Sequence, residues 1–140
     1  MKGVLTYTPE SPYDDVPERH YHFPQRYLTV AERLVGDRVL YYRPGEGARH
    51  FFAVAKVADI VPDDAWRDAP HYYARMVPES YRAFATPVPA RLPWGEYLDA
   101  AVEATEPRAR RPLLRRAVRG MDEGSFARVL ELAGVSMRQT

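Results

Sequence analysis

Apolar residues fall into short runs along the chain that are typical of β-strands, separated by turns rich in proline and glycine. We expect strands at residues 3–8, 37–43, 50–61, 71–77 and 84–90. Pro87 and Pro89 restrict the last of these to a sheet edge or a bulge, because proline cannot donate a ladder hydrogen bond. The turn Pro44–Gly47 lies between two β-rich runs and predicts a hairpin.

Helical spacing appears at both ends of the chain. Apolar residues from Tyr27 to Val35 recur on one helical face. We expect this helix to begin within His20–Pro24, with proline in its first turn, and to end at Gly36. Two further helices are predicted, at residues 94–104 and 122–133.

Several strands around one early helix, followed by helices, indicate an α+β fold, which we interpret as a small barrel with a C-terminal helical extension. The chain has 140 residues, enough to bury a core within one domain. We therefore assign residues 1–104 to the barrel and residues 105–140 to a basic helical extension or linker.

Composition narrows the possible functions. Hydrophobic residues make up 46% of the chain, which argues against disorder along its whole length. The absence of cysteine excludes disulfides, cysteine-based zinc fingers and thiol chemistry. No signal peptide is recognisable, and no apolar run approaches the roughly 20 residues that cross a bilayer. We therefore expect a cytoplasmic protein with no membrane partner.

Charge is distributed unevenly along the chain, although the formal net charge is only +1. Residues 105–140 contain eight arginines and four acidic residues, a net of +4, so residues 1–104 carry −3. An acidic body disfavours non-specific phosphate binding, so we expect nucleic-acid contacts at local sites and in the basic tail. The tail arginines are equally typical of a solvated helix face or a linker.

One cluster of aromatic, histidine and carboxylate residues surrounds the expected start of the first helix. Its members are Tyr13, Asp14, Asp15, Tyr21, His22 and Phe23. Flat rings stack on a flipped base, and a carboxylate accepts a hydrogen bond from the amino group of cytosine or adenine. A surface loop with anchoring aromatic residues would explain the cluster equally well. A metal site needs a third ligand at suitable spacing, so we expect no metal and no cofactor.

A second aromatic cluster is Tyr41-Tyr42-Arg43. Side chains alternate along a strand, so we expect one tyrosine in the core and the other available for stacking, although packing alone would explain both. The arginines expected to contact a nucleic-acid backbone are Arg19, Arg26, Arg43, Arg110 and Arg111.

Signatures of catalysis are missing from the sequence. It has no glycine-rich phosphate loop between a strand and a helix, and no Gly-x-Ser-x-Gly motif. The remaining catalytic alternative pairs Asp14 or Asp15 with His22. We therefore expect no catalytic residue in this chain and interpret it as a binding protein.

Two segments carry a family resemblance. Val35–Pro44, with the pattern Gly-Asp-Arg-Val-Leu-Tyr-Tyr, and Phe52–Asp63, which ends in Pro-Asp, resemble the centre of the PUA-like superfamily and of EVE domains in particular. Tyr13-Asp-Asp, followed by Tyr-His-Phe-Pro-x-Arg-Tyr-Leu at residues 21–28, is similar to the N-terminal domain of bacterial HNH-type, modification-dependent restriction endonucleases. The resemblance covers residues 3–90, and Tyr-His-Phe-Pro is its more specific motif.

The resemblance implies a PUA-like pseudo-barrel, of the EVE or SRA type, that flips a modified base, often a modified cytosine in DNA, into an aromatic cage. The resemblance assigns the role of this cage to Tyr21–Phe23 and Tyr41–Arg43. EVE domains often have serine or histidine where this chain has Arg43, which leaves the ligand open. The resemblance also implies a C-terminal nuclease. No His-Asn-His pattern follows residue 120, so we expect either an excised specificity domain or a binder that acts alone.

The leading hypothesis is therefore a reader of a modified base in DNA. The alternatives are an RNA-binding module of the same barrel family and a small-molecule or hydrolytic barrel that uses Asp15 and His22. A plain interaction domain is a further alternative, which full burial of the aromatic residues would favour.

Overall fold

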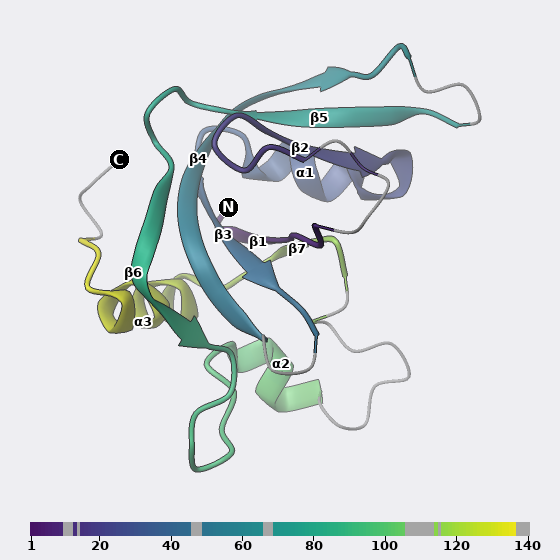
Figure 1. Cartoon of the computed structure of the whole chain (residues 1–140). Helices are drawn as coiled ribbons and strands as arrows, with labels where there is room; N and C mark the ends of the chain where they lie inside the picture. The colour runs from purple at the N-terminus through teal and green to yellow at the C-terminus, as the bar shows by residue number, and fades with distance from the viewer. Residues whose placement is uncertain are drawn as a thin grey trace.

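One long strand, β4 (His50–Pro62), connects the two halves of the structure (Figure 1). The computed structural model describes residues 1–9, 13, 15–45, 49–65, 69–105, 114 and 116–136. The other strands are β1 (Gly3–Thr6), β2 (His20–Pro24), β3 (Arg38–Arg43), β5 (His71–Met76), β6 (Arg82–Pro89) and β7 (Val118–Gly120). The helices are α1 (Leu28–Leu34), α2 (Ala100–Thr105) and α3 (Glu123–Ala133), with a 3-10 turn, η1 (Gln25–Tyr27), before α1.

The strands of the described residues form one sheet in the order β2-β5-β4-β3-β1-β7, and β6 pairs with β4 beside this path. β1 is parallel to β3, and the other pairs are antiparallel. The first half of β4 pairs with β3 and β6, and the second half pairs with β5. A register shift between Val57 and Asp59 accompanies the change of partner, and Figure 1 shows β4 strongly curved. The α+β class is confirmed, while the described strands leave the sheet open instead of closing it into a barrel.

Most of the predicted elements are confirmed. The expected strands are present as β1, β3, β4, β5 and β6, and β3 and β4 form the predicted hairpin. Among the described strands β6 pairs with β4 alone, so Pro87 and Pro89 lie on an edge strand, as expected. At the start of α3, the Asp122 side chain accepts a 2.8 Å hydrogen bond from the N–H of Ser125. Gly134, with φ of 74°, ends the helix.

The prediction that a helix begins within His20–Pro24 was wrong. This segment is β2, which pairs with β5 along its whole length, and α1 starts only at Leu28. The Asp15 carboxylate contacts the middle of β2, where it accepts a 2.7 Å hydrogen bond from the N–H of His22. Successive side chains of β2 are buried, so the sequence lacks the alternation that distinguishes a strand from a helix.

The helix predicted over residues 94–104 is shorter than expected, because only Ala100–Thr105 is helical. The segment Leu92–Gly95 forms a tight turn instead, closed by a 2.8 Å hydrogen bond from the N–H of Gly95 to the carbonyl of Leu92. Gly95 has φ of 98°, and proline follows Leu92, so both residues favour a turn over a helix. None of the helices in the described ranges is long and apolar enough to cross a lipid bilayer.

The C-terminal segment joins the same core where the structure describes it. β7 pairs with β1, and Arg119 on β7 forms a buried ion pair with Asp99. Phe126 and Leu130 of α3 are 0% exposed and belong to the cluster that contains residues of β1 and β3. The boundary predicted at residue 104 therefore does not divide the hydrophobic core.

Both faces of the sheet are covered at β3. Leu40 and Tyr42 pack in the cluster that includes α3, whereas Val39 and Tyr41 pack in the cluster that includes α1. All four side chains are at most 2% exposed. The expectation that one tyrosine faces outward was wrong, because a strand covered on both faces has no outward side.

The Gly-Asp pair before β3 has a structural role. Gly36 has φ of 83°, and Asp37 follows it directly. Oδ1 of Asp37 accepts a 2.5 Å hydrogen bond from Nζ of Lys2 and a 2.8 Å bond from the N–H of Arg38. Partial burial acts to raise the pKa of Asp37, but these hydrogen bonds lower it to about 2.

Ionised Asp37 should stabilise the fold above its unfolded-state pKa of about 3.9, and this contribution should be lost as the pH falls towards 2. We expect Asp37→Asn to lower the free energy of unfolding near neutral pH and to flatten its decline at acid pH. Urea unfolding across this pH range would measure both effects. An acid dependence identical to that of the unsubstituted protein would contradict the role of this carboxylate.

Gly3 packs too closely for any side chain. A Cβ at this position would lie 2.6 Å from Cδ2 of Leu34 and 2.8 Å from the backbone oxygen of Arg119. We expect Gly3→Ala to lower the free energy of unfolding by about 1–3 kcal/mol, as overpacking does. Gly124→Ala is the matched control, because Gly124 is exposed within α3 and its nearest contact would be 3.4 Å away. A loss of stability in both variants, measured by urea unfolding, would contradict the proposed clash.

Candidate functional site

The rings that the sequence assigns to a base cage lie in the hydrophobic core. The exposed fractions are 0% for Phe23 and Tyr41, 2% for His22 and Tyr42, and 3% for Tyr21. The predicted cage is therefore wrong in its location, because these rings do not line an open slot. Burial of these rings is the outcome that favours the alternative of a plain interaction domain. The other predicted contacts Asp14, Arg110 and Arg111 lie outside the described residues.

Two of the buried tyrosines hold neighbouring segments in place. The hydroxyl of Tyr21 donates a 2.6 Å hydrogen bond to the carbonyl of Thr6, and that of Tyr41 donates a 2.8 Å bond to the carbonyl of Pro17. Burial, and then the nearby charge of Asp15, raises the pKa of both hydroxyls, so they remain neutral donors. These bonds fix the end of β1 and the segment before β2.

Asp15 and the ring of His22 have different hydrogen-bonding and ion-pair contacts. Asp15 accepts a hydrogen bond from the backbone of His22, while Nε2 of the His22 ring lies 2.9 Å from Oδ2 of Asp63. The ring also stacks on Tyr73, with centroids 4.6 Å apart, and meets the ring of Tyr13 edge-on at 5.2 Å. Across the described ranges, no three His, Cys, Asp or Glu side chains are arranged to hold a metal ion.

A different group of aromatic residues lies at the edge of the hydrophobic core. Tyr7, Phe52 and Tyr81 are only partly buried, and they gather around the buried ring of Tyr41. The ring of Tyr41 lies 5.8 Å from Phe52 and 6.0 Å from Tyr81, and Tyr7 lies 5.9 Å from Phe52, between centroids. We call these four residues the ring cluster. It brings together the chain after β1, strands β3 and β4, and the residue before β6.

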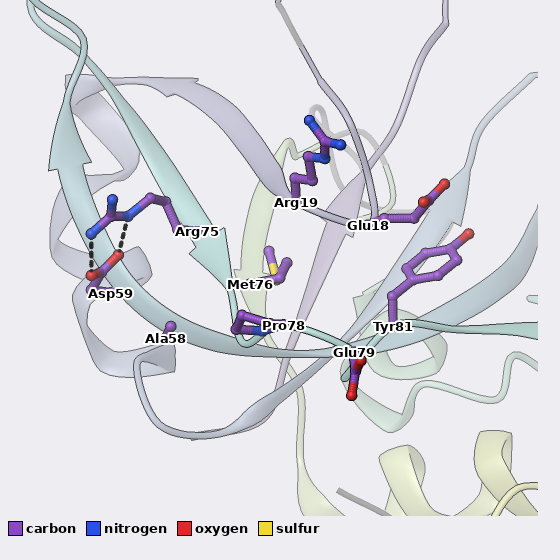
Figure 2. A pocket seen from close by; sticks show the side chains of 9 residues that line it. All are labelled: Glu18, Arg19, Ala58, Asp59, Arg75, Met76, Pro78, Glu79 and Tyr81. Carbon is purple, nitrogen blue, oxygen red and sulfur yellow. Dashed lines mark hydrogen bonds and ion pairs between the residues drawn. The ribbon is translucent and has the colours of Figure 1, made fainter.

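A pocket of about 790 Å³ adjoins the ring cluster at Tyr81 (Figure 2). The pocket is an open depression, and its volume lies within the range of roughly 300–1,000 Å³ that is typical of small-molecule sites. Four segments line it: the chain before β2, the β4 bulge, the end of β5 and the turn into β6. The lining residues are Glu18, Arg19, Ala58, Asp59, Arg75, Met76, Pro78, Glu79 and Tyr81.

The turn before β6 positions Tyr81. The N–H of Ser80 donates a 3.0 Å hydrogen bond to the carbonyl of Val77, and Oγ of Ser80 accepts one of 3.0 Å from the N–H of Lys56. Glu79 has φ of 67°, a conformation that favours glycine or asparagine in such turns. Non-glycine residues in this conformation are enriched at ligand sites, where the surrounding structure holds them.

The pocket has a mixed charge. Arg75 and Asp59 neutralise each other through two hydrogen bonds of 2.7 and 2.6 Å, and theirs is the one interaction marked among the lining residues in Figure 2. Glu18 lies near the phenol of Tyr81: burial, and then the charge of Glu18, raises the pKa of that phenol. Arg19 supplies a cation on the same segment as Glu18.

Of the described arginines predicted to contact a nucleic-acid backbone, Arg19 lines the pocket. Arg26 lies over the ring of Tyr27, 5.1 Å from its centroid, and Arg43 is exposed at the end of β3. Neither of these two belongs to the pocket lining.

Sequence reasoning missed three of the four ring-cluster residues and Glu18. Tyr7 and Phe52 lie in predicted strands, and Phe52 also begins a segment that carries the family resemblance, but neither is predicted as a site residue. Tyr81 follows the strand predicted at residues 71–77 without a motif of its own. The local sequence contains no signal that groups them, because their proximity depends on which strands pair and in which register.

Comparison of the chain with known protein families, with curated proteins and with solved structures finds no match. The site is therefore interpreted from its own geometry and from the sequence motifs described above.

The hydrogen bond from Tyr41 to Pro17 should stabilise the segment that borders the pocket. We expect Tyr41→Phe to lower the free energy of unfolding by about 0.5–1.5 kcal/mol, because the carbonyl of Pro17 loses its hydrogen-bond donor. Tyr42→Phe is the matched control, since no hydrogen bond joins its hydroxyl to a residue in the described ranges. Equal losses for the two variants in urea unfolding would contradict this assignment.

Proposed function

We propose that this chain is a nucleic-acid-binding module that reads an unstacked base at the ring cluster and its adjoining pocket. The observation that carries this proposal is the position of Tyr81. Its partly exposed ring belongs to an aromatic group and also lines a pocket that contains a carboxylate, Glu18, and a cation, Arg19. A base needs flat surfaces for stacking and polar groups for its edge, and a nucleotide also needs a partner for its phosphate.

The energetics are consistent with this role. Flipping a base out of a duplex costs a few kcal/mol, and stacking on an aromatic side chain returns about 1–3 kcal/mol. Hydrogen bonds within the pocket must therefore supply the rest for a duplex target, whereas an unpaired base needs less.

The family resemblance favours a modified cytosine in DNA as the target and a PUA-like pseudo-barrel as the fold. The curved β4 pairs with β3 along one part and with β5 along another, which is compatible with that fold. On this proposal the chain is the specificity module of an HNH-type nuclease and contributes no catalytic residue itself. The base site proposed here replaces the cage predicted at Tyr21–Phe23. Tyr41 belongs to both, as the buried member of the ring cluster.

The basic tail gives this proposal a second support. The carbonyl of Arg116 accepts a 2.9 Å hydrogen bond from the hydroxyl of Thr6, directly before Tyr7 of the ring cluster. Arg116, a residue of the basic tail, thus lies against the end of β1, next to Tyr7 in the sequence. Arg26, Arg43, Arg110 and Arg111 remain proposed contacts to the nucleic-acid backbone.

Binding measurements test the proposal directly. We expect Tyr81→Ala to weaken binding of an oligonucleotide that contains 5-methylcytosine by roughly 10-fold or more, because about 1–3 kcal/mol of stacking is lost. Trp94→Ala is the control, since Trp94 is 70% exposed and does not line the pocket. Fluorescence anisotropy would give the affinities of the folded variants.

The choice of target decides between the candidate functions. Tighter binding to a duplex with 5-methylcytosine or 5-hydroxymethylcytosine than to unmodified DNA would support a modified-base reader. Equal affinity for all three duplexes would refute that part of the proposal. A preference for single-stranded RNA would support the RNA-binding alternative, in which the same ring cluster stacks on the bases of RNA.

A further inference from the structure

We infer that Glu18 makes the pocket selective for bases that carry an exocyclic amino group, so that it accepts cytosine-type bases and rejects their oxo counterparts. The inference rests on the proposed function, and it assigns the choice of base to a residue outside the aromatic motifs. Glu18 belongs to the segment between Pro17 and Arg19, which the hydrogen bond from Tyr41 to Pro17 holds against the ring cluster.

The geometry places this carboxylate beside the stacking surface. Figure 2 shows the side chains of Glu18 and Tyr81 on the same side of the pocket, with the carboxylate near the phenol end of the ring. Glu79, in the turn before β6, points away from both. Asp59 is already bonded to Arg75 through both of its oxygens. Glu18 is therefore the carboxylate best placed to meet the edge of a base stacked on Tyr81.

The chemistry of a carboxylate sets the direction of the selectivity. An ionised carboxylate only accepts hydrogen bonds. The amino group at C4 of cytosine donates one, whereas the oxygen at C4 of thymine or uracil is itself an acceptor and would face Glu18 without a proton between them. Buried polar sites reject such mismatches by several orders of magnitude. Glu18 is exposed, so water compensates for part of the mismatch, and we expect about 10-fold discrimination.

The sharpest test compares 5-methylcytosine with thymine, because the two bases share the ring and the methyl group and differ at C4 and in the protonation of N3. Each base is placed once in otherwise identical single-stranded DNA, which removes any effect of base pairing. We expect the unsubstituted protein to bind the 5-methylcytosine strand about 10-fold more tightly. Glu18→Gln should bring the ratio close to one, because an amide both donates and accepts.

Two variants serve as controls for this ratio. Glu32→Gln changes an exposed carboxylate on α1, outside the pocket lining, and should leave both affinities unchanged. Arg19→Gln should weaken both strands to the same extent if Arg19 contacts a phosphate, because phosphate contacts do not depend on the base.

The outcomes separate this inference from the proposed function. If Tyr81→Ala weakens binding but Glu18→Gln leaves the 5-methylcytosine-to-thymine ratio unchanged, base reading stands and the role of Glu18 is overturned. The proposed function itself fails if the unsubstituted protein binds neither strand. It also fails if the Tyr81→Ala variant binds both strands as tightly as the unsubstituted protein. A ratio that collapses in Glu18→Gln alone supports the inference.

Discussion

The structure depends on the burial of β3 on both of its faces. Its backbone pairs with β1 and β4, while the cluster with α3 covers one face and the cluster with α1 covers the other. Every side chain from Val39 to Tyr42 therefore belongs to a core, and Arg43 is the first exposed residue of the strand. Because the centre of the sheet is fully occupied, a ligand has access where strands end or bend.

Several strands end or bend around Tyr81. β4 changes partner at its bulge, β5 ends at Met76, and the chain turns through Glu79 into β6. The hydrogen bonds of Ser80 secure this turn against β4, and the bond from Tyr41 to Pro17 secures the facing segment. The pocket is therefore lined by segments that the two cores hold in place, which limits the entropy that a ligand would need to remove.

Whether a charged side chain is available to a ligand depends on whether it lies in the core or at the surface. Arg119, which belongs to the basic tail by sequence, is buried in an ion pair with Asp99 and is unavailable to a phosphate. Arg19, in the acidic body, is exposed beside the pocket. The net charge of a sequence segment therefore does not identify a binding surface. The burial and ion-pair partner of each charged side chain are more informative.

The sequence by itself determined the features that depend on residues a few positions apart. Turn residues and apolar runs located β3, β4, β5 and β6, and Asp122 and Gly134 delimited α3, because caps and turns are local interactions. Only the tertiary structure decided that His20–Pro24 is a strand, since pairing with β5 outweighs its local preference. It also decided that both strand tyrosines are buried and that Tyr7, Phe52 and Tyr81 meet, because strand order and register are set by contacts between distant segments.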